Sequence, residues 1–263
     1  MLEWIIFALI GVLSGLSSGL LGLGGGVIIV PALLVVFSWQ GLLGPHLMHM
    51  AVATSLMTII VTSATSAYSH HQHRNVDWNL VTRLIPGLVL GGMVGAVLAT
   101  QLSSQFLQRF FAIYLLFAAI KMWLPTPLTL HKQLLNKSAL IGFGSVVGII
   151  SSLVGIGGGT LIVPYLVMAN QSIKRAIGTS ATCGLPIAIS AVTGFILFGQ
   201  EQEGNTLIGE AGFIYWPAFW GIISTSSLFA IVGVKLAKKL PMMVLKQLFS
   251  IVLLMGAVYL VFN

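Results

Sequence analysis

The sequence predicts an all-α integral membrane protein made of two inverted-topology repeats. Each repeat consists of a glycine-broken, re-entrant-type helical hairpin and three transmembrane helices. Three observations support this fold class: few charged residues, eight apolar runs and a motif shared by the two halves. Of the 263 residues, 57% are apolar and only 6% are charged, against roughly 25% in an ordinary soluble domain. So few charges cannot coat a water-facing surface, which excludes a soluble globular protein, a disordered chain and a nucleic-acid-binding protein.

The eight apolar runs define the expected helices, because a helix needs about 20 apolar residues to cross the hydrocarbon. Two of them, Trp4–Phe37 and Ala139–Ala169, are too long for one crossing and contain glycines in the middle. As one helix, Trp4–Phe37 would be about 50 Å long. The other six fit one crossing each: Met48–Ala67, Leu84–Leu102, Phe106–Leu124, Ile177–Phe198, Gly212–Val234 and Val244–Phe262. Aromatic residues near the run ends are typical interfacial anchors: Trp4, Trp78, Trp123 and Trp216.

An internal repeat relates the two halves of the chain. Residues 22–31, GLGGGVIIVP, match residues 155–164, GIGGGTLIVP. Later positions also correspond: Thr54 and Ser55 match Thr179 and Ser180, and Pro86 and Pro217 are expected to open the third segment of each half. The repeat predicts a first membrane repeat at 1–125, a cytoplasmic connector at 126–137 and a second membrane repeat at 138–263.

The distribution of charge predicts the orientation. If each glycine-broken run enters and returns on the same side, 11 of the 12 basic residues fall on one side, with Arg109 as the exception. By the positive-inside rule that side is the cytoplasm, so both termini lie on the periplasmic side of a bacterial inner membrane. The loop with Glu201, Glu203 and Glu210 also lies outside. Each half then makes an odd number of crossings, which inverts one half relative to the other.

The glycine breaks are the candidate binding site. The spans carry no Asp, Glu, Lys or Arg away from their ends, which disfavours a sodium site with a carboxylate. A helix that restarts near Val27 or Thr160 presents free N–H groups and a positive dipole end, which together can hold an anion. Candidate substrate-binding residues are Gly24, Gly25, Gly26, Thr54, Ser55, Gly157, Gly158, Gly159, Thr179 and Ser180. The alternative is that such glycines serve tight helix packing, as we expect for Gly91 and Gly95, and that the hydroxyls bond to their own helices.

Histidines and the one cysteine are the remaining reactive groups. His46 and His49 lie near the outer end of the second run and are candidates for proton coupling. His70, His71 and His73 with Arg74 could bind metal, but the sequence offers no second ligand group, so a solvated basic loop is expected. Because Cys183 is the only cysteine of the sequence, an internal disulfide is excluded, and Cys183 is expected to be a small packing residue. No cofactor and no metal site are predicted.

The doubled glycine motif with Pro31 and Pro164, together with the Thr-Ser pairs, resembles the TauE/SafE family of sulfite-exporter-like permeases. The resemblance covers essentially the whole chain. It implies the transport of small sulfur-containing anions such as sulfite, sulfonates or sulfoacetate across the bacterial inner membrane, with the proton as the candidate coupling ion.

The favoured function is therefore a secondary transporter that works by alternating access, with a small anion and the lipid bilayer as partners. A passive anion channel of the same architecture is the alternative. An intramembrane enzyme would need a Ser/His, Asp/Asp or metal-binding histidine set within the spans, and none is present in the sequence. A membrane scaffold would not explain two matched glycine breaks.

Overall fold

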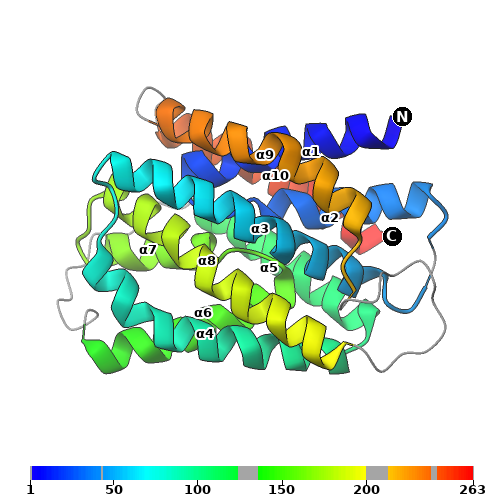
Figure 1. Ribbon diagram of the computed structural model, residues 1–263, viewed down its shortest axis with the longest axis horizontal. Coiled ribbons are helices and arrows are strands. Elements are labelled where there is room, and N and C mark those ends of the chain that lie inside the picture. Colours follow the sequence, from blue (N-terminus) through cyan, green and yellow to red (C-terminus); the bar gives the residue numbers. More distant parts are fainter. Residues whose placement is uncertain (1, 43, 124–135, 200–212, 238–241, 263) are drawn as a thin grey trace.

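The computed structural model describes residues 2–42, 44–123, 136–199, 213–237 and 242–262, and within these ranges it is entirely helical (Figure 1). Its elements are α1 Leu2–Leu21, α2 Gly26–Trp39, α3 Leu47–Gln72, α4 Trp78–Gln101, α5 Ser104–Trp123, α6 Lys137–Val154, α7 Gly159–Met168, α8 Ile173–Phe198, α9 Trp216–Leu236 and α10 Met242–Phe262. Within the described ranges, seven helices are long and apolar enough to cross a membrane: α1, α3, α4, α5, α6, α8 and α9. The all-α membrane fold is therefore confirmed.

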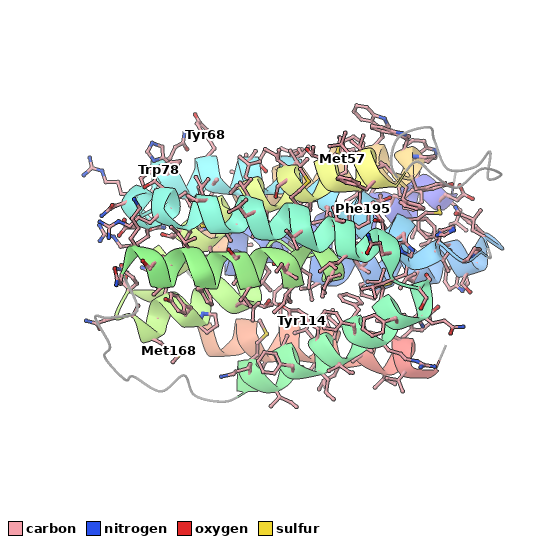
Figure 2. The ribbon with its side chains drawn as sticks, turned by 90° about the horizontal axis from the view of Figure 1, so that it is seen from below. Met57, Tyr68, Trp78, Tyr114, Met168 and Phe195 are labelled. Carbon is pink, nitrogen blue, oxygen red and sulfur yellow. The ribbon has the colours of Figure 1, made fainter. Side chains whose placement is uncertain are left out.

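The helices run along the long axis of the molecule, and both chain termini lie at the same end (Figure 1). Helices α4, α6 and α8 begin at the opposite end, where α3 also finishes. We call this opposite end the basic end, because Lys137 opens α6 and Lys174 and Arg175 lie in the first turn of α8. Figure 2 shows Tyr68 and Trp78 projecting outward at the same end, as expected of aromatic residues at a membrane interface.

Helices from the two halves interdigitate. Helix α1 packs along α9 and α4 packs along α6, while α3 lies against α8 and α5 lies against α10. Glycines allow close approach in the α1–α9 and α4–α6 pairs. In the α4–α6 pair, a carbon atom added to Gly91 of α4 would lie 2.1 Å from the carbonyl oxygen of Ser145 on α6. Gly95 meets Ile149 in the same way. The packing interpretation of Gly91 and Gly95 is therefore confirmed.

The third segment begins earlier than its hydropathy predicts. Helix α4 starts at Trp78, where the Asp77 carboxylate accepts the backbone N–H of Leu80 at 3.2 Å. Pro86 consequently lies inside α4, whereas Pro217 occupies the start of α9. The prediction that both prolines open these segments is wrong for Pro86, because a capping residue rather than the first apolar residue decides where this helix begins.

Helix α8 shows the same effect at its start. The hydroxyl of Ser172 accepts the backbone N–H of Arg175, so α8 begins at Ile173 and its basic residues belong to the first turn rather than to a loop. Of the expected connector at 126–137, residues 126–135 lie outside the described part of the chain, as does the loop with the three glutamates, residues 200–212.

Candidate functional site

The two glycine-rich loops, residues 22–25 and 155–158, meet inside the bundle, and we call this region the glycine crossing. A carbon atom added to Gly24 would lie 3.0 Å from the Cα atom of Gly157. In the reverse direction, a carbon atom added to Gly157 would lie 3.1 Å from the Cα atom of Gly24. The two backbones can approach this closely only because neither residue has a side chain, so glycine is required on both sides of the contact.

On either side of this central contact, each loop faces the first residue of the helix that follows the other loop. A carbon atom added to Gly26 would lie 2.0 Å from the carbonyl oxygen of Gly155. A carbon atom added to Gly159 would lie 2.2 Å from the carbonyl oxygen of Gly22. The two contacts are repeat equivalents of one another, so the loops pass each other with the same set of backbone contacts on both sides.

The helices α2 and α7 begin at the crossing. Their N-cap residues, Gly25 and Gly158, have φ angles of +87° and +77°, a left-handed conformation that strongly favours glycine. The first intrahelical bonds run to the carbonyls of these two residues from the third residue onward. The amides of the first two residues of each helix therefore have no intrahelical acceptor, and the dipoles place partial positive charge at the same point. Such a point can hold an anion without a cationic side chain.

Two of the predicted hydroxyls donate hydrogen bonds to the loops of the glycine crossing from the neighbouring helices. Ser55 on α3 donates to the carbonyl oxygen of Gly155 at 2.8 Å. Ser180 on α8 makes the equivalent, longer contact with the carbonyl oxygen of Gly22 at 3.4 Å. Both serines are buried. Each hydroxyl thus binds the loop of the other half, which leaves its oxygen lone pairs, rather than its proton, for any further contact.

The two predicted threonines hold the starts of other helices. Thr54 accepts the backbone N–H of Tyr215, the N-cap residue of α9, at 2.9 Å. Thr179 accepts the backbone N–H of Asp77, the N-cap residue of α4, at 3.0 Å. The two hydrogen bonds are again equivalent, and each joins one half of the chain to the other.

These threonine contacts predict a loss of stability rather than of substrate affinity. We expect Thr54→Val and Thr179→Val each to lower the free energy of unfolding by about 1–2 kcal/mol, because each leaves a backbone N–H without its acceptor. Chemical unfolding in detergent measures this effect. Thr193→Val is the control, because Thr193 is exposed and its hydroxyl bonds within its own helix. Equal stability of all three variants and the unmodified protein would contradict the structural role.

A row of polar side chains on α3 was not predicted from the sequence. This polar stripe consists of Ser55, Thr58, Thr62, Ser66 and His70, all buried. Its members recur every three or four residues, so they share one face of the helix, and this spacing could have revealed the row in the sequence. On α8 the positions at the same distances from Ser180 are apolar: Cys183, Ile187, Ala191 and Phe195. The equivalent faces of α3 and α8 therefore differ: the face on α3 is polar, and the face on α8 is apolar.

The polar stripe follows the end of α1. Thr62 donates to the carbonyl of Gly24 at 3.2 Å and Ser66 to the carbonyl of Ser18, also at 3.2 Å. His70 contacts the carbonyl of Gly19 through Nε2 at 3.1 Å. Because a carbonyl only accepts, the hydrogen is on Nε2. Helix α3 thus places a polar side chain on this face at each turn between the glycine crossing and the basic end.

The expectation of a solvated loop is wrong for His70. Its exposed fraction is only 2%, and it lies in the last turn of α3. His71, one residue later, is exposed and accepts the indole N–H of Trp78 at 3.1 Å. Polar neighbours made the whole segment look like a loop, but the helix continues to Gln72 and turns one histidine of the cluster inward.

Four further buried hydroxyls have no hydrogen-bond partner among the described residues, those of Ser18, Ser63, Ser151 and Ser226. Ser18 and Ser151 each lie four residues before the first glycine of a loop, at equivalent positions of the repeat. Buried hydroxyls are normally paired, so these donors are available to a solute or to water that enters beside the crossing. Cys183 is buried among apolar side chains, which agrees with its expected packing role.

Comparison with known proteins identifies the family. The family described as Sulfite exporter TauE/SafE matches residues 7–260. The chain belongs to the TauE/SafE sulfite exporter family. It is accordingly a membrane transporter, and its relatives carry names of transporters rather than of enzymes.

Relatives of this TauE/SafE-family chain come from bacteria and an archaeon. One from Haemophilus influenzae, named "Probable membrane transporter protein", is 36% identical over 254 residues, which cover 95% of each chain. One of that description from Methanocaldococcus jannaschii is 28% identical over 195 residues, covering 73% of this chain and 71% of the relative. A third, from Bacillus subtilis, is 24% identical over 282 residues, covering 100% and 98%. No solved structure was found to match.

The two candidate proton-coupling histidines of this transporter lie together, away from the glycine crossing. The rings of His46 and His49 are 5.4 Å apart, and each lies within 5.4 Å of the ring of Phe213. His49 is buried, and its Nε2 lies 3.0 Å from the carbonyl oxygens of both Ala99 and Leu102. It thereby supplies a donor to the end of α4, where carbonyls lack intrahelical partners. The Nδ1 atoms of both histidines have no partner within the described residues.

Proposed function

We propose that this chain is a secondary transporter that moves small sulfur-containing anions, of the sulfite, sulfonate or organosulfur type, across the bacterial inner membrane by alternating access. The glycine crossing carries the proposal: α2 and α7 begin there and direct free amides and positive dipole ends to one buried place. Sulfite and sulfonates share a compact group of three oxygens that accept hydrogen bonds. Backbone amides and hydroxyls suit such a group, and no carboxylate is needed.

The proposal treats residues 1–125 and 138–263 as inverted repeats joined by a cytoplasmic connector at 126–137, with both termini in the periplasm. The packing supports this arrangement, because exchanging the halves converts the α1–α9 contact into the α6–α4 contact. The paired hydrogen bonds of Thr54 and Thr179 exchange in the same way. Transporters built on inverted repeats hold their substrate at the repeat interface, where discontinuous helices meet.

The contact between the loops supports alternating access. Gly24 and Gly157 are in backbone contact, so an anion can reach the amides only when the two halves separate on one side. Rocking of one half against the other would open the crossing to each side in turn. We further propose His46 and His49 as the proton-coupling pair, because protonation there would offset the charge of the transported anion.

Purified protein in liposomes tests the proposal. We expect labelled sulfite to exchange with internal sulfite and to accumulate against its gradient when a proton gradient is imposed, and we expect sulfonates to compete. Protein-free liposomes measure leakage. Flow to equilibrium without accumulation or counterflow would instead support a passive anion channel. Competition by carboxylates but not by sulfonates would contradict the proposed substrate class.

A further inference from the structure

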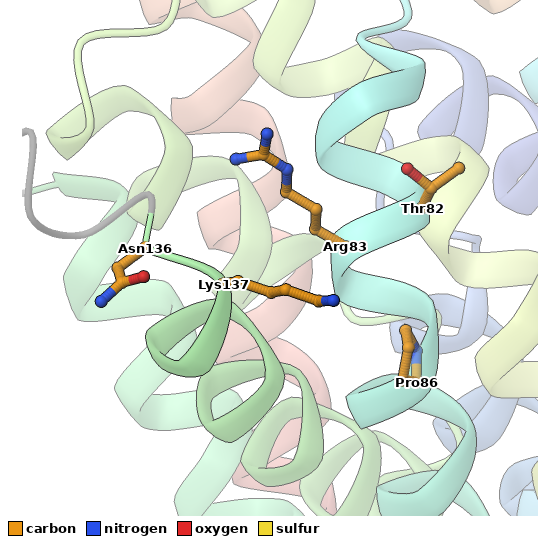
Figure 3. A pocket seen from close by; sticks show the side chains of 5 residues that line it. All are labelled: Thr82, Arg83, Pro86, Asn136 and Lys137. Carbon is orange, nitrogen blue, oxygen red and sulfur yellow. The ribbon is translucent and has the colours of Figure 1, made fainter.

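A cationic pocket lies between α4 and α6, at the basic end of the bundle (Figure 3). It has a volume of about 550 Å³ and is lined by Thr82, Arg83, Pro86, Asn136 and Lys137. Figure 3 shows the side chains of Arg83 and Lys137 reaching into the gap from opposite helices. The pocket therefore brings together two positive charges that are far apart in the sequence.

No carboxylate within the described residues forms an ion pair with Arg83 or Lys137. The chain has only five acidic residues, and Asp77 is the one nearest to Arg83 in the sequence. Its carboxylate caps the start of α4 by accepting the N–H of Leu80. Residues 124–135, which precede Lys137, contain no Asp or Glu. No carboxylate of the described residues therefore balances these two positive charges, which makes the pocket suited to an anionic ligand.

The other groups of the pocket add little to anion recognition. The Thr82 hydroxyl already donates to the carbonyl of Asn79 at 3.1 Å. Pro86 has no N–H, so it offers no backbone donor and leaves the Thr82 carbonyl without its usual helical partner. The Asn136 amide can donate. Recognition therefore rests mainly on the guanidinium of Arg83, which can hold two oxygens of one oxyanion, and on the ammonium of Lys137.

The surroundings of the pocket indicate where the anion comes from. Pro86 is exposed, and exposed aliphatic residues follow it along the same face of α4 at intervals of four residues: Leu90, Val94 and Leu98. In a membrane-spanning helix such a face lies against acyl chains. An amphipathic anion could place its headgroup in the pocket and its chain along this face. A small soluble anion, which has no acyl chain, would contact only the two cationic side chains.

We propose that this pocket binds the phosphate group of an anionic phospholipid in the leaflet at the basic end of the bundle. Basic pockets between transmembrane helices are suited to anionic headgroups. The single negative charge of such a phosphodiester would be shared by both cations and would bridge the α4–α6 contact from outside. The site does not depend on which substrate the transporter carries, because it lies on the outer face of these two helices and not at the glycine crossing.

Lipid binding to the full chain, purified in a neutral detergent, tests the proposal. Native mass spectrometry would measure the dissociation constant for phosphatidylglycerol, with phosphatidylcholine and inorganic phosphate in parallel. We expect selective binding of phosphatidylglycerol, weakened about 25-fold by the double change Arg83→Gln and Lys137→Gln, since a cation near an anionic surface contributes about fivefold. Should the double variant not fold, each single change is expected to weaken binding by about fivefold.

The matched control is the double change Lys174→Gln and Lys235→Gln, which removes the same charge from α8 and α9. It should leave the dissociation constant within about twofold of the unmodified protein, because neither residue lines the pocket. Equal weakening by both double variants would show only general attraction and would overturn the site. Equal binding of phosphatidylcholine would overturn anion recognition. Pocket-dependent binding of inorganic phosphate as tight as that of phosphatidylglycerol would overturn the lipid as the occupant.

Discussion

Leucine in place of Gly25 is expected to abolish transport while the protein remains in the membrane. Gly25 is the N-cap residue of α2 with φ at +87°, and a side chain in this conformation costs roughly 1–2 kcal/mol. An added carbon atom would lie 2.9 Å from the backbone oxygen of Ser14, so α1 and α2 would have to move apart. This movement would displace the free amides from the glycine crossing. Uptake of labelled sulfite into liposomes, with the amount of inserted protein measured in parallel, checks the prediction.

Gly142→Leu is the control for this experiment. Gly142 lies on α6, and an added carbon atom would meet no other atom within 4 Å, so the same change in volume should leave transport near the unmodified rate. Gly158→Leu, at the equivalent cap of α7 with φ at +77°, should reproduce the loss. Uptake at the normal rate by Gly25→Leu and Gly158→Leu would count decisively against the crossing as the binding site.

Phenylalanine in place of His70 is expected to lower the free energy of unfolding by about 2–6 kcal/mol. Phenylalanine is the residue that α8 carries at the matching position, Phe195. The change removes the donor to the buried carbonyl of Gly19, which costs roughly 1–3 kcal/mol. It also forces a larger ring into a fully packed place, which costs roughly 1–3 kcal/mol more. Unfolding by denaturant in detergent measures the total.

The variant His71→Phe tests whether the loss of stability depends on the buried position of His70 or only on the replacement of a histidine by phenylalanine. His71 is exposed, and its contact with Trp78 lies at the surface, so this variant should lose less than about 1 kcal/mol. Equal losses in the two variants would show that the inward position of His70 has no energetic importance. A fall in sulfite uptake in His70→Phe at normal protein level would add a functional role to the polar stripe.

Composition and the doubled motif were sufficient to predict the all-α membrane fold and the positions of the two helix breaks. A chain with 6% charged residues and apolar runs of about 20 residues satisfies its backbone in lipid by forming helices. The two glycine triplets also located both breaks, because consecutive glycines permit the left-handed caps at Gly25 and Gly158. Local rules of this kind act within a few residues, so they can be read without knowing what lies across the fold.

Hydropathy was less informative about where helices begin. Polar residues lowered the hydropathy around Asn79 and Arg83, although the Asp77 cap extends α4 through both. The same polarity hid the inward turn of His70, because hydropathy does not distinguish the two sides of one helical turn. A search for polar residues at helical spacing would have found the polar stripe.

The residues alone established that this chain lies in a membrane and that two of its apolar segments break at glycine, since both properties depend on local composition and conformation. Which atoms meet was decided by the fold. Ser55 and Gly155 are 100 positions apart, and Arg83 faces Lys137 across a pocket, because helices from opposite halves are packed side by side. Contacts of this range depend on the whole arrangement of helices, and no short stretch of the chain contains that information.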